Sequence, residues 1–164
     1  MKVLYYGGQK SGKSSLAEAK TIELSINKKP YYIATYDNSY GDKEMQKRVS
    51  KHQSQRADNF ETIEEKFELS KVIIDGNTYL IDCISMWLLN GLEKEEEKLL
   101  EEIEKLSLKD ANIVFVLNDV SSGVIPFEKV SRKYVDLSGI IGQKLASICD
   151  EVYEVKLGLA QSLK

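Results

Sequence analysis

The sequence predicts an α/β protein in which a mostly parallel sheet is flanked by helices. Short apolar segments alternate with longer amphipathic segments along the 164 residues, which is the pattern of strand–helix–strand units. The apolar segments are rich in β-branched and aromatic residues and lack polar alternation, as is typical of strands buried on both faces. A glycine-rich segment separates the first predicted strand from the first predicted helix. The length fits one domain.

Five strands and five helices are expected in alternation. The strands are predicted at residues 3–6, 31–34, 79–81, 113–117 and 152–155. The helices are predicted at residues 14–27, 42–58, 83–92, 93–106 and 128–149. The fourth helix has Leu99, Leu100, Ile103 and Leu106 on one face and seven glutamates elsewhere, which we interpret as a solvated face rather than an interaction surface. Because the chain shows no repeat and no linker-like segment, we expect residues 1–164 to form one domain.

The composition argues against several classes of protein. Lys plus Arg is 23 and Asp plus Glu is 26, so the net charge is −3, which disfavours duplex nucleic acid or an anionic membrane as the main partner. The two cysteines, Cys83 and Cys149, lie far apart in apolar stretches, so we expect two buried thiols in a reducing compartment. No run approaches the ~18 apolar residues of a membrane span, and no signal-peptide pattern is seen. A cytoplasmic protein is expected.

A phosphate-binding loop is the strongest motif in the chain. The segment from residue 7 to 14 fits G-x-x-x-x-G-K-[ST] and consists of Gly7, Gly8, Gln9, Lys10, Ser11, Gly12, Lys13 and Ser14. Its glycines let backbone N–H groups converge on phosphate oxygens, and the following helix adds the positive end of its dipole. Lys13 is expected to reach the outer phosphates and the Ser14 hydroxyl to bind Mg²⁺. The fold class is therefore that of the P-loop NTPases, and the motif indicates a nucleoside triphosphate without indicating which base it carries.

Asp82 is the candidate for the second group at the metal. It ends the apolar segment at residues 79–81, and we expect that strand to neighbour the strand that leads into the phosphate loop. An aspartate at a strand end is also common as a helix N-cap, so its position alone does not indicate a metal ligand. The metal-binding role is inferred because the same chain contains a phosphate loop. Asp75 competes for the role, but the sequence Asp75-Gly76-Asn77 is explained by a turn.

A stripe of basic residues surrounds the one histidine of the chain. Arg48, His52 and Arg56 are spaced four residues apart and would share one helix face. Two fixed positive charges disfavour protonation of His52, which would stay a neutral nucleophile, while the guanidinium groups would bind a polyphosphate. Attack on an α-phosphate would then give a nucleotidyl-histidine. From the spacing alone, a polar surface helix with an incidental histidine is the commoner explanation.

The order of motifs resembles the family of bifunctional adenosylcobinamide kinases and adenosylcobinamide-phosphate guanylyltransferases of cobalamin biosynthesis. The resemblance begins at the phosphate loop and extends over nearly the whole chain. It is carried by the loop at residues 7–14 with Ala17 and Glu18, by residues 32–35, by Glu44, Met45, Arg48, His52 and Arg56, by residues 62–64, by residues 81–83 with Met86, Trp87, Leu88 and Asn90, and by residues 118–120 and 123–126 with Arg132, Asp136, Gly139 and Gln143. Lys10, Phe60 and Asp119 stand where the family usually has arginine, tryptophan and glutamate.

The resemblance implies a site and a reaction. His52 would be the guanylylated residue, and adenosylcobinamide and its phosphate would be the acceptors. Besides the phosphate loop, the nucleotide would contact Ala34, Thr35, Tyr36, Gln53, Ser54, Gln55, Arg56, Glu64 and Asp82. Glu64 could accept hydrogen bonds from guanine or ribose, although a solvated glutamate beside Glu61 and Glu65 explains it equally from the sequence. The family also implies a homotrimer, and it implies GTP or ATP as the nucleotide held with Mg²⁺ at Ser14 and Asp82, the two residues expected from the motif.

Three other functions are compatible with parts of the pattern. One is a guanylyltransferase that has lost its kinase activity, and another is an ordinary P-loop kinase of a small molecule in which His52 has no role. The third is a nucleotide-gated binding module, but the Asn-Lys-x-Asp base reader of a GTPase switch is not supplied by the sequence at residues 117–120.

Overall fold

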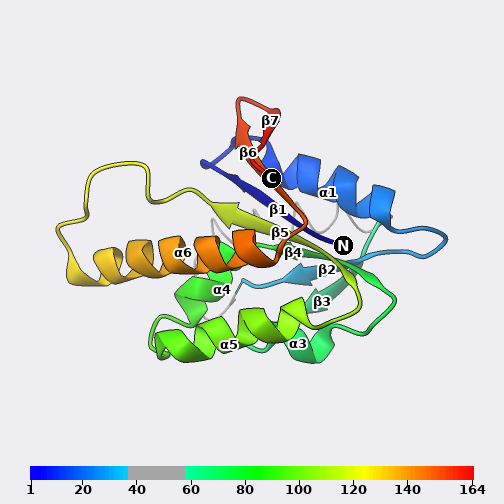
Figure 1. Ribbon diagram of the computed structural model, residues 1–164, viewed down its shortest axis with the longest axis horizontal. Coiled ribbons are helices and arrows are strands. Elements are labelled where there is room, and N and C mark those ends of the chain that lie inside the picture. Colours follow the sequence, from blue (N-terminus) through cyan, green and yellow to red (C-terminus); the bar gives the residue numbers. More distant parts are fainter. Residues whose placement is uncertain (37–57) are drawn as a thin grey trace.

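Seven strands form one sheet in the order β3-β2-β4-β5-β1-β6-β7 (Figure 1). The computed structural model describes residues 1–36 and 58–164. Strands β1 to β6 run parallel to their neighbours, and only β7 pairs in the antiparallel direction, with β6. The mostly parallel sheet expected from the sequence is therefore confirmed. The strands are β1 (Lys2–Gly7), β2 (Tyr31–Ala34), β3 (Glu61–Glu64), β4 (Thr78–Asp82), β5 (Asn112–Asn118), β6 (Glu151–Lys156) and β7 (Leu159–Ser162).

Helices cover both faces of this sheet because the central strands are apolar on both sides. Helix α1 packs through Ala17 against the face that carries Val3, Val114 and Val116. The other described helices pack on the opposite face, in a larger core that includes Phe115. The helices are α1 (Lys13–Leu24), α3 (Leu69–Val72), α4 (Ile84–Asn90), α5 (Glu96–Ser107) and α6 (Lys129–Ile148). Successive residues of each strand thus enter alternate cores, as the pleat requires.

The parallel strands all end at one edge of the sheet. Gly7 lies opposite Asn118 and Val155, and Ala34 lies opposite Glu64 and Asp82 in the register of the sheet. In open α/β sheets, ligands bind beyond the carboxyl ends of the strands. The fold therefore gathers the chain segments after β1, β2, β3 and β4 at the edge where a ligand is expected.

The sequence missed three short elements. Strand β3 lies at the edge of the sheet with mostly exposed side chains, and β7 is exposed throughout, so neither has the apolar signal of a central strand. Helix α3 has only four residues, too few for a helical period. The helix expected at residues 42–58 lies outside the described residues apart from Asp58, which is in a turn. No helix in the described ranges combines the length and apolarity needed to cross a membrane.

One glutamate of helix α5 is an exception to the expected solvated face. The aliphatic side chains of Leu99, Ile103 and Leu106 are buried as predicted, but Glu102 is also only 7% exposed. Its carboxylate accepts a hydrogen bond of 2.7 Å from the backbone N–H of Ser70 in the first turn of α3. An anion at this end of a helix satisfies an N–H group that has no partner within the helix. The expectation of a fully solvated acidic face is therefore wrong at Glu102.

Candidate functional site

The phosphate loop joins the end of β1 to the start of α1, as the motif requires. Strand β1 lies between β5 and β6, and Lys13 is the first residue of the 12-residue helix α1. Within the loop, the N–H of Ser11 donates to the carbonyl of Gly8 at 3.2 Å, and the N–H of Leu16 donates to that of Gly12 at 3.2 Å. The positive end of α1 therefore faces the carboxyl edge of the sheet, where it favours an anion.

The three glycines of the loop are explained by three different structural constraints. A Cβ on Gly7 would collide with the backbone carbonyl oxygen of Val155, and Gly12 has a φ of +96°, which side-chain-bearing residues rarely adopt. A Cβ on Gly8, in contrast, would meet no protein atom within 4 Å. The fold thus requires glycine at Gly7 and Gly12, whereas the bare backbone at Gly8 leaves room for a ligand to approach closely.

Lys13 is buried at the base of the loop. Its side chain is only 6% exposed, and its ammonium group donates to the carbonyl of Gly8 at 3.0 Å. A buried cation is costly unless it is compensated by polar or anionic partners. This placement puts the positive charge beneath the loop whose N–H groups are expected to bind phosphate.

Four of the residues predicted from the sequence come together at the carboxyl edge. Ala34, Glu64 and Asp82 end β2, β3 and β4 in one row of the sheet, and Thr35 follows directly after Ala34. Glu64 is exposed, so its carboxylate is accessible from solvent. Tyr36, the last described residue before residues 37–57, is half-buried beyond Thr35. The predicted contacts His52, Gln53, Ser54, Gln55 and Arg56, together with Arg48, lie outside the described residues.

Asp82 does not lie on the strand next to the phosphate loop, contrary to the expectation. Strand β5 lies between β1 and β4, so two strand spacings, about 10 Å, separate the ends of β1 and β4. Desolvation together with the nearby Asp82 carboxylate raises the pKa of the Cys83 thiol to about 12, while the Lys13 ammonium acts in the opposite direction. Both charges therefore lie within electrostatic reach of one thiol.

The whole chain matches one family of proteins. The model of the family described as "Cobinamide kinase / cobinamide phosphate guanyltransferase" matches residues 3–163. The chain belongs to this family. Its curated relatives include the bifunctional adenosylcobalamin biosynthesis protein CobP of Pseudomonas aeruginosa, 35% identical over 100% of this chain and 98% of that protein. They also include the protein CobU of Escherichia coli, 30% identical over 100% of both chains, and that of Salmonella typhimurium, 29% identical with the same coverage.

A solved structure of low sequence identity shares the fold. The flagellar accessory protein FlaH from Methanocaldococcus jannaschii superposes with a TM-score of 0.53 at 15% identity, over 99% of this chain and 77% of that one. At this identity, the likeness concerns the fold alone. The α/β class and the arrangement of helices around a mostly parallel sheet agree with it.

In this member of the cobinamide kinase family, Thr35 and Asn90 tie the ends of the strands together. The hydroxyl of Thr35, which is fully buried, donates to the carbonyl of Cys83 at 2.8 Å and accepts from its N–H at 3.1 Å. The amide of Asn90, the last residue of α4, donates to the carbonyls of Thr35 at 2.7 Å and Lys66 at 3.2 Å. These hydrogen bonds hold the chain after β2 against the chain after β4 at the carboxyl edge of the sheet.

Asn90→Ala is expected to weaken nucleotide binding together with stability. It removes two hydrogen bonds that hold the segments after β2 and β3 in place, at a cost of about 1–3 kcal/mol. Asn112→Ala is the matched control, because the Asn112 amide donates to the carbonyl of Leu24 at the opposite edge of the sheet. Thermal unfolding should show a loss in both variants, while the Kd for GTP should rise only in Asn90→Ala. Equal Kd values in the two variants would contradict this role for Asn90.

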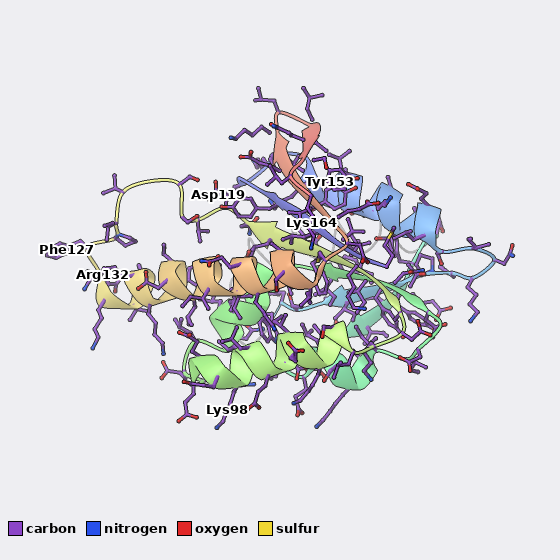
Figure 2. All side chains as sticks on the ribbon, in the orientation of Figure 1. Lys98, Asp119, Phe127, Arg132, Tyr153 and Lys164 are labelled. Atoms are coloured by element: carbon purple, nitrogen blue, oxygen red, sulfur yellow. The ribbon has the colours of Figure 1, made fainter. Side chains whose placement is uncertain are left out.

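Asp119 fixes the segment that follows β5 beside the phosphate loop. Its N–H donates to the carbonyl of Gly7 at 2.8 Å, and its carboxylate accepts from the N–H groups of Ser121 and Ser122 at 3.1 Å each. Burial raises the pKa of Asp119, but hydrogen bonds from Ser122, Tyr6 and Ser121 outweigh it and bring it to about 2. A carboxylate with this pKa is a poor proton acceptor at neutral pH. Asp119 therefore fixes the beginning of the long segment between β5 and α6, and Phe127 lies at the far end of that segment (Figure 2).

Sequence reasoning named Asn90 only through the family pattern and missed the backbone contacts of Asp119. A polar residue at the end of an otherwise apolar helix is the signal that could have indicated Asn90. The described residues contain no group of three or more His, Cys, Asp or Glu side chains placed to hold a metal ion. Mg²⁺ in nucleotide sites takes one or two protein ligands and completes its shell with phosphates and waters, an arrangement that needs no such group.

Proposed function

We propose that the protein phosphorylates adenosylcobinamide and then transfers GMP from GTP to adenosylcobinamide phosphate through a guanylyl-histidine at His52. The product is adenosylcobinamide-GDP, an intermediate in assembly of the nucleotide loop of cobalamin. The observation that carries the proposal is the family match over residues 3–163. It is supported by the strand–loop–helix arrangement of the phosphate loop, in which Lys13 is buried. Both reactions would use this one phosphate loop.

In the kinase step, the loop would act by positioning and by electrostatic stabilisation. The γ-phosphoryl group passes to the hydroxyl of the aminopropanol arm of adenosylcobinamide, and the nucleoside diphosphate leaves. The N–H groups of residues 8–14 and the ammonium of Lys13 would stabilise the charge that develops on the transferred group. Either ATP or GTP fits this loop, because its contacts are to phosphates and not to a base.

Ser14 and Asp82 are the residues that would hold Mg²⁺. Their hydroxyl and carboxylate oxygens are the hard donors that Mg²⁺ prefers, and Asp82, one strand further from the loop, would bind the ion directly or through a water. When bound, the ion would neutralise negative charge on the phosphates. The chain itself would orient the nucleotide through the loop and the first turn of α1.

In the guanylyl step, the neutral imidazole of His52 would attack the α-phosphorus of GTP. A P–N bond forms, the bond from the α-phosphorus to the bridging oxygen breaks, and pyrophosphate leaves with that electron pair. A phosphate oxygen of adenosylcobinamide phosphate then attacks the same phosphorus and releases the imidazole. Arg48 and Arg56 would keep His52 unprotonated and bind the polyphosphate, as their spacing in the sequence suggests.

The remaining contacts of the nucleotide are proposed along the row at the sheet edge. Ala34, Thr35 and Tyr36 would approach it through the chain after β2, and the accessible carboxylate of Glu64 would accept hydrogen bonds from guanine or ribose. Gln53, Ser54 and Gln55 would complete the contacts beside His52. We also propose a homotrimer acting in the cytoplasm, on the basis of the resemblance of the sequence to this family.

A product assay tests the whole proposal. The protein is incubated with adenosylcobinamide, ATP, GTP and MgCl₂, and the corrinoids are separated and weighed by mass spectrometry. We expect adenosylcobinamide-GDP from the unaltered protein, and adenosylcobinamide phosphate without the GDP product from His52→Ala. GMP transfer to supplied adenosylcobinamide phosphate without any phosphorylation of adenosylcobinamide would instead indicate a transferase that lacks kinase activity. The absence of both products would contradict the proposal.

A further inference from the structure

The turn between β6 and β7 lies directly against the phosphate loop. Leu157 and Gly158 form this turn with φ angles of +52° and +80°. The N–H of Gly158 donates to the carbonyl of Ser11, inside the phosphate loop, at 2.8 Å. The Cα of Gly158 lies 3.1 Å from the position that a Cβ on Gly12 would occupy. One residue of the hairpin thus touches the loop at two successive positions.

Strand β6 supports the beginning of the same loop. The carbonyl oxygen of Val155 occupies the space that a side chain on Gly7 would need, and Val155 is itself fully buried. The C-terminal hairpin therefore contacts the loop at Gly7, where it begins, and at Ser11 and Gly12, just before α1. These contacts come from chain about 150 residues further on, so they belong to the tertiary fold and not to the local motif.

The shape of a phosphate loop matters because its N–H groups must converge on the ligand. The described loop contains one internal turn bond, from Ser11 to Gly8, and a left-handed residue at Gly12. One hydrogen bond from an N–H group to a charged ligand typically contributes about tenfold or more to its affinity. An external hydrogen bond to the Ser11 carbonyl would therefore have a large effect on binding if it sets the direction of the neighbouring peptide planes.

We propose that the β6–β7 hairpin is a positioning element for the phosphate loop and that Gly158 is the residue through which it acts. Gly158 holds the Ser11 carbonyl away from the ligand side and closes the space behind Gly12. The role needs a residue that adopts a backbone φ of +80°, which glycine and asparagine tolerate and which is strained for β-branched residues. This inference rests on the part of the proposed function in which the loop binds a nucleoside triphosphate.

Gly76 provides a matched control for a substitution at Gly158. It has a φ of +78°, a Cβ there would meet no atom within 4 Å, and its N–H donates to the carbonyl of Asp110 at 2.7 Å. The same three features hold at Gly158, where the acceptor is the Ser11 carbonyl. Gly76 precedes β4 and so lies at the opposite edge of the sheet from the phosphate loop. Valine at either glycine introduces the same strain, but only one of them touches the loop.

The experiment compares Gly158→Val, Gly76→Val and Gly158→Asn in the full chain. Thermal unfolding gives the stability of each variant, and calorimetric titration gives the Kd for GTP and for ATP. We expect both valine variants to unfold at lower temperature, with the Kd raised about tenfold or more only in Gly158→Val. Gly158→Asn should restore a Kd near that of the unaltered protein. If Gly158→Val does not fold, Gly158→Ala and Gly76→Ala provide the same comparison with less strain.

The outcomes separate this inference from the proposed function. Equal Kd values in Gly158→Val and Gly76→Val would overturn the positioning role while leaving nucleotide binding intact. A Kd in Gly158→Asn as weak as in Gly158→Val would also overturn it, because relief of the backbone strain should restore the loop. Failure of the unaltered protein to bind GTP or ATP would overturn the proposed function and this inference with it.

Discussion

Lys13→Met is expected to abolish both the phosphorylation of adenosylcobinamide and the guanylylation of His52. The substitution removes the positive charge that lies beneath the phosphate loop and keeps a side chain of similar length in its buried position. A preorganised donor that stabilises developing charge typically contributes roughly 10²- to 10³-fold to kcat. Because we propose that the two reactions share one loop, each should fall by at least this factor. Initial rates with γ-labelled and α-labelled nucleotide measure the two effects separately.

Lys20→Met is the control for this substitution. Lys20 lies on the same helix, and its ammonium forms an ion pair of 3.2 Å with Glu151, away from the loop. The control should keep both activities and unfold at a lower temperature, since it breaks an ion pair whose side chains are only 15% and 27% exposed. Loss of only one activity in Lys13→Met would contradict the shared site. Retention of both would show that the loop does not bind the reacting phosphates.

The central part of the fold was predictable because its signal is local. All five predicted strands exist, and their boundaries differ by at most one residue at each end. Strand β5 is the clearest case, because Ile113 to Leu117 are all buried, so every residue contributes to the apolar signal. The position of the phosphate loop between a strand and a helix was equally predictable, since the spacing of its glycines, Lys13 and Ser14 is a local motif, whereas its contacts with Val155 and Gly158 are not. Helix α1 begins at Lys13, one residue earlier than expected, because Gly12 caps it in a left-handed conformation.

The rest of the site depends on contacts that no local pattern contains. The order of the strands places β5 between Asp82 and the phosphate loop, and strand order is a property of the whole chain. The pairing of the Asn90 amide with two carbonyls and the contact of Gly158 with Ser11 join segments far apart in sequence. Glu102 was predicted to be solvated because a glutamate among glutamates gives no sign of its buried partner, the N–H of Ser70. Tertiary hydrogen bonds to backbone groups leave little trace in the side-chain sequence.

His52→Ala is expected to remove the covalent intermediate entirely. No other residue can replace it as a histidine nucleophile, because His52 is the one histidine among the 164 residues. The substitution should leave the phosphate loop intact, so the variant should still bind GTP and phosphorylate adenosylcobinamide. Guanylyl transfer, which we propose to proceed through the adduct, should be lost with it. This combination distinguishes a missing nucleophile from a general loss of the fold.

The most direct measurement is the labelling of the protein by GTP that carries its label on the α-phosphate. The unaltered protein should retain the label after denaturation, and the bond should be labile in acid and stable in base, as expected of a phosphorus–nitrogen linkage. Adding adenosylcobinamide phosphate should transfer the label to the corrinoid. His52→Ala should carry no label. A protein that forms no adduct, or one that remains labelled in His52→Ala, would contradict the guanylyl-histidine mechanism.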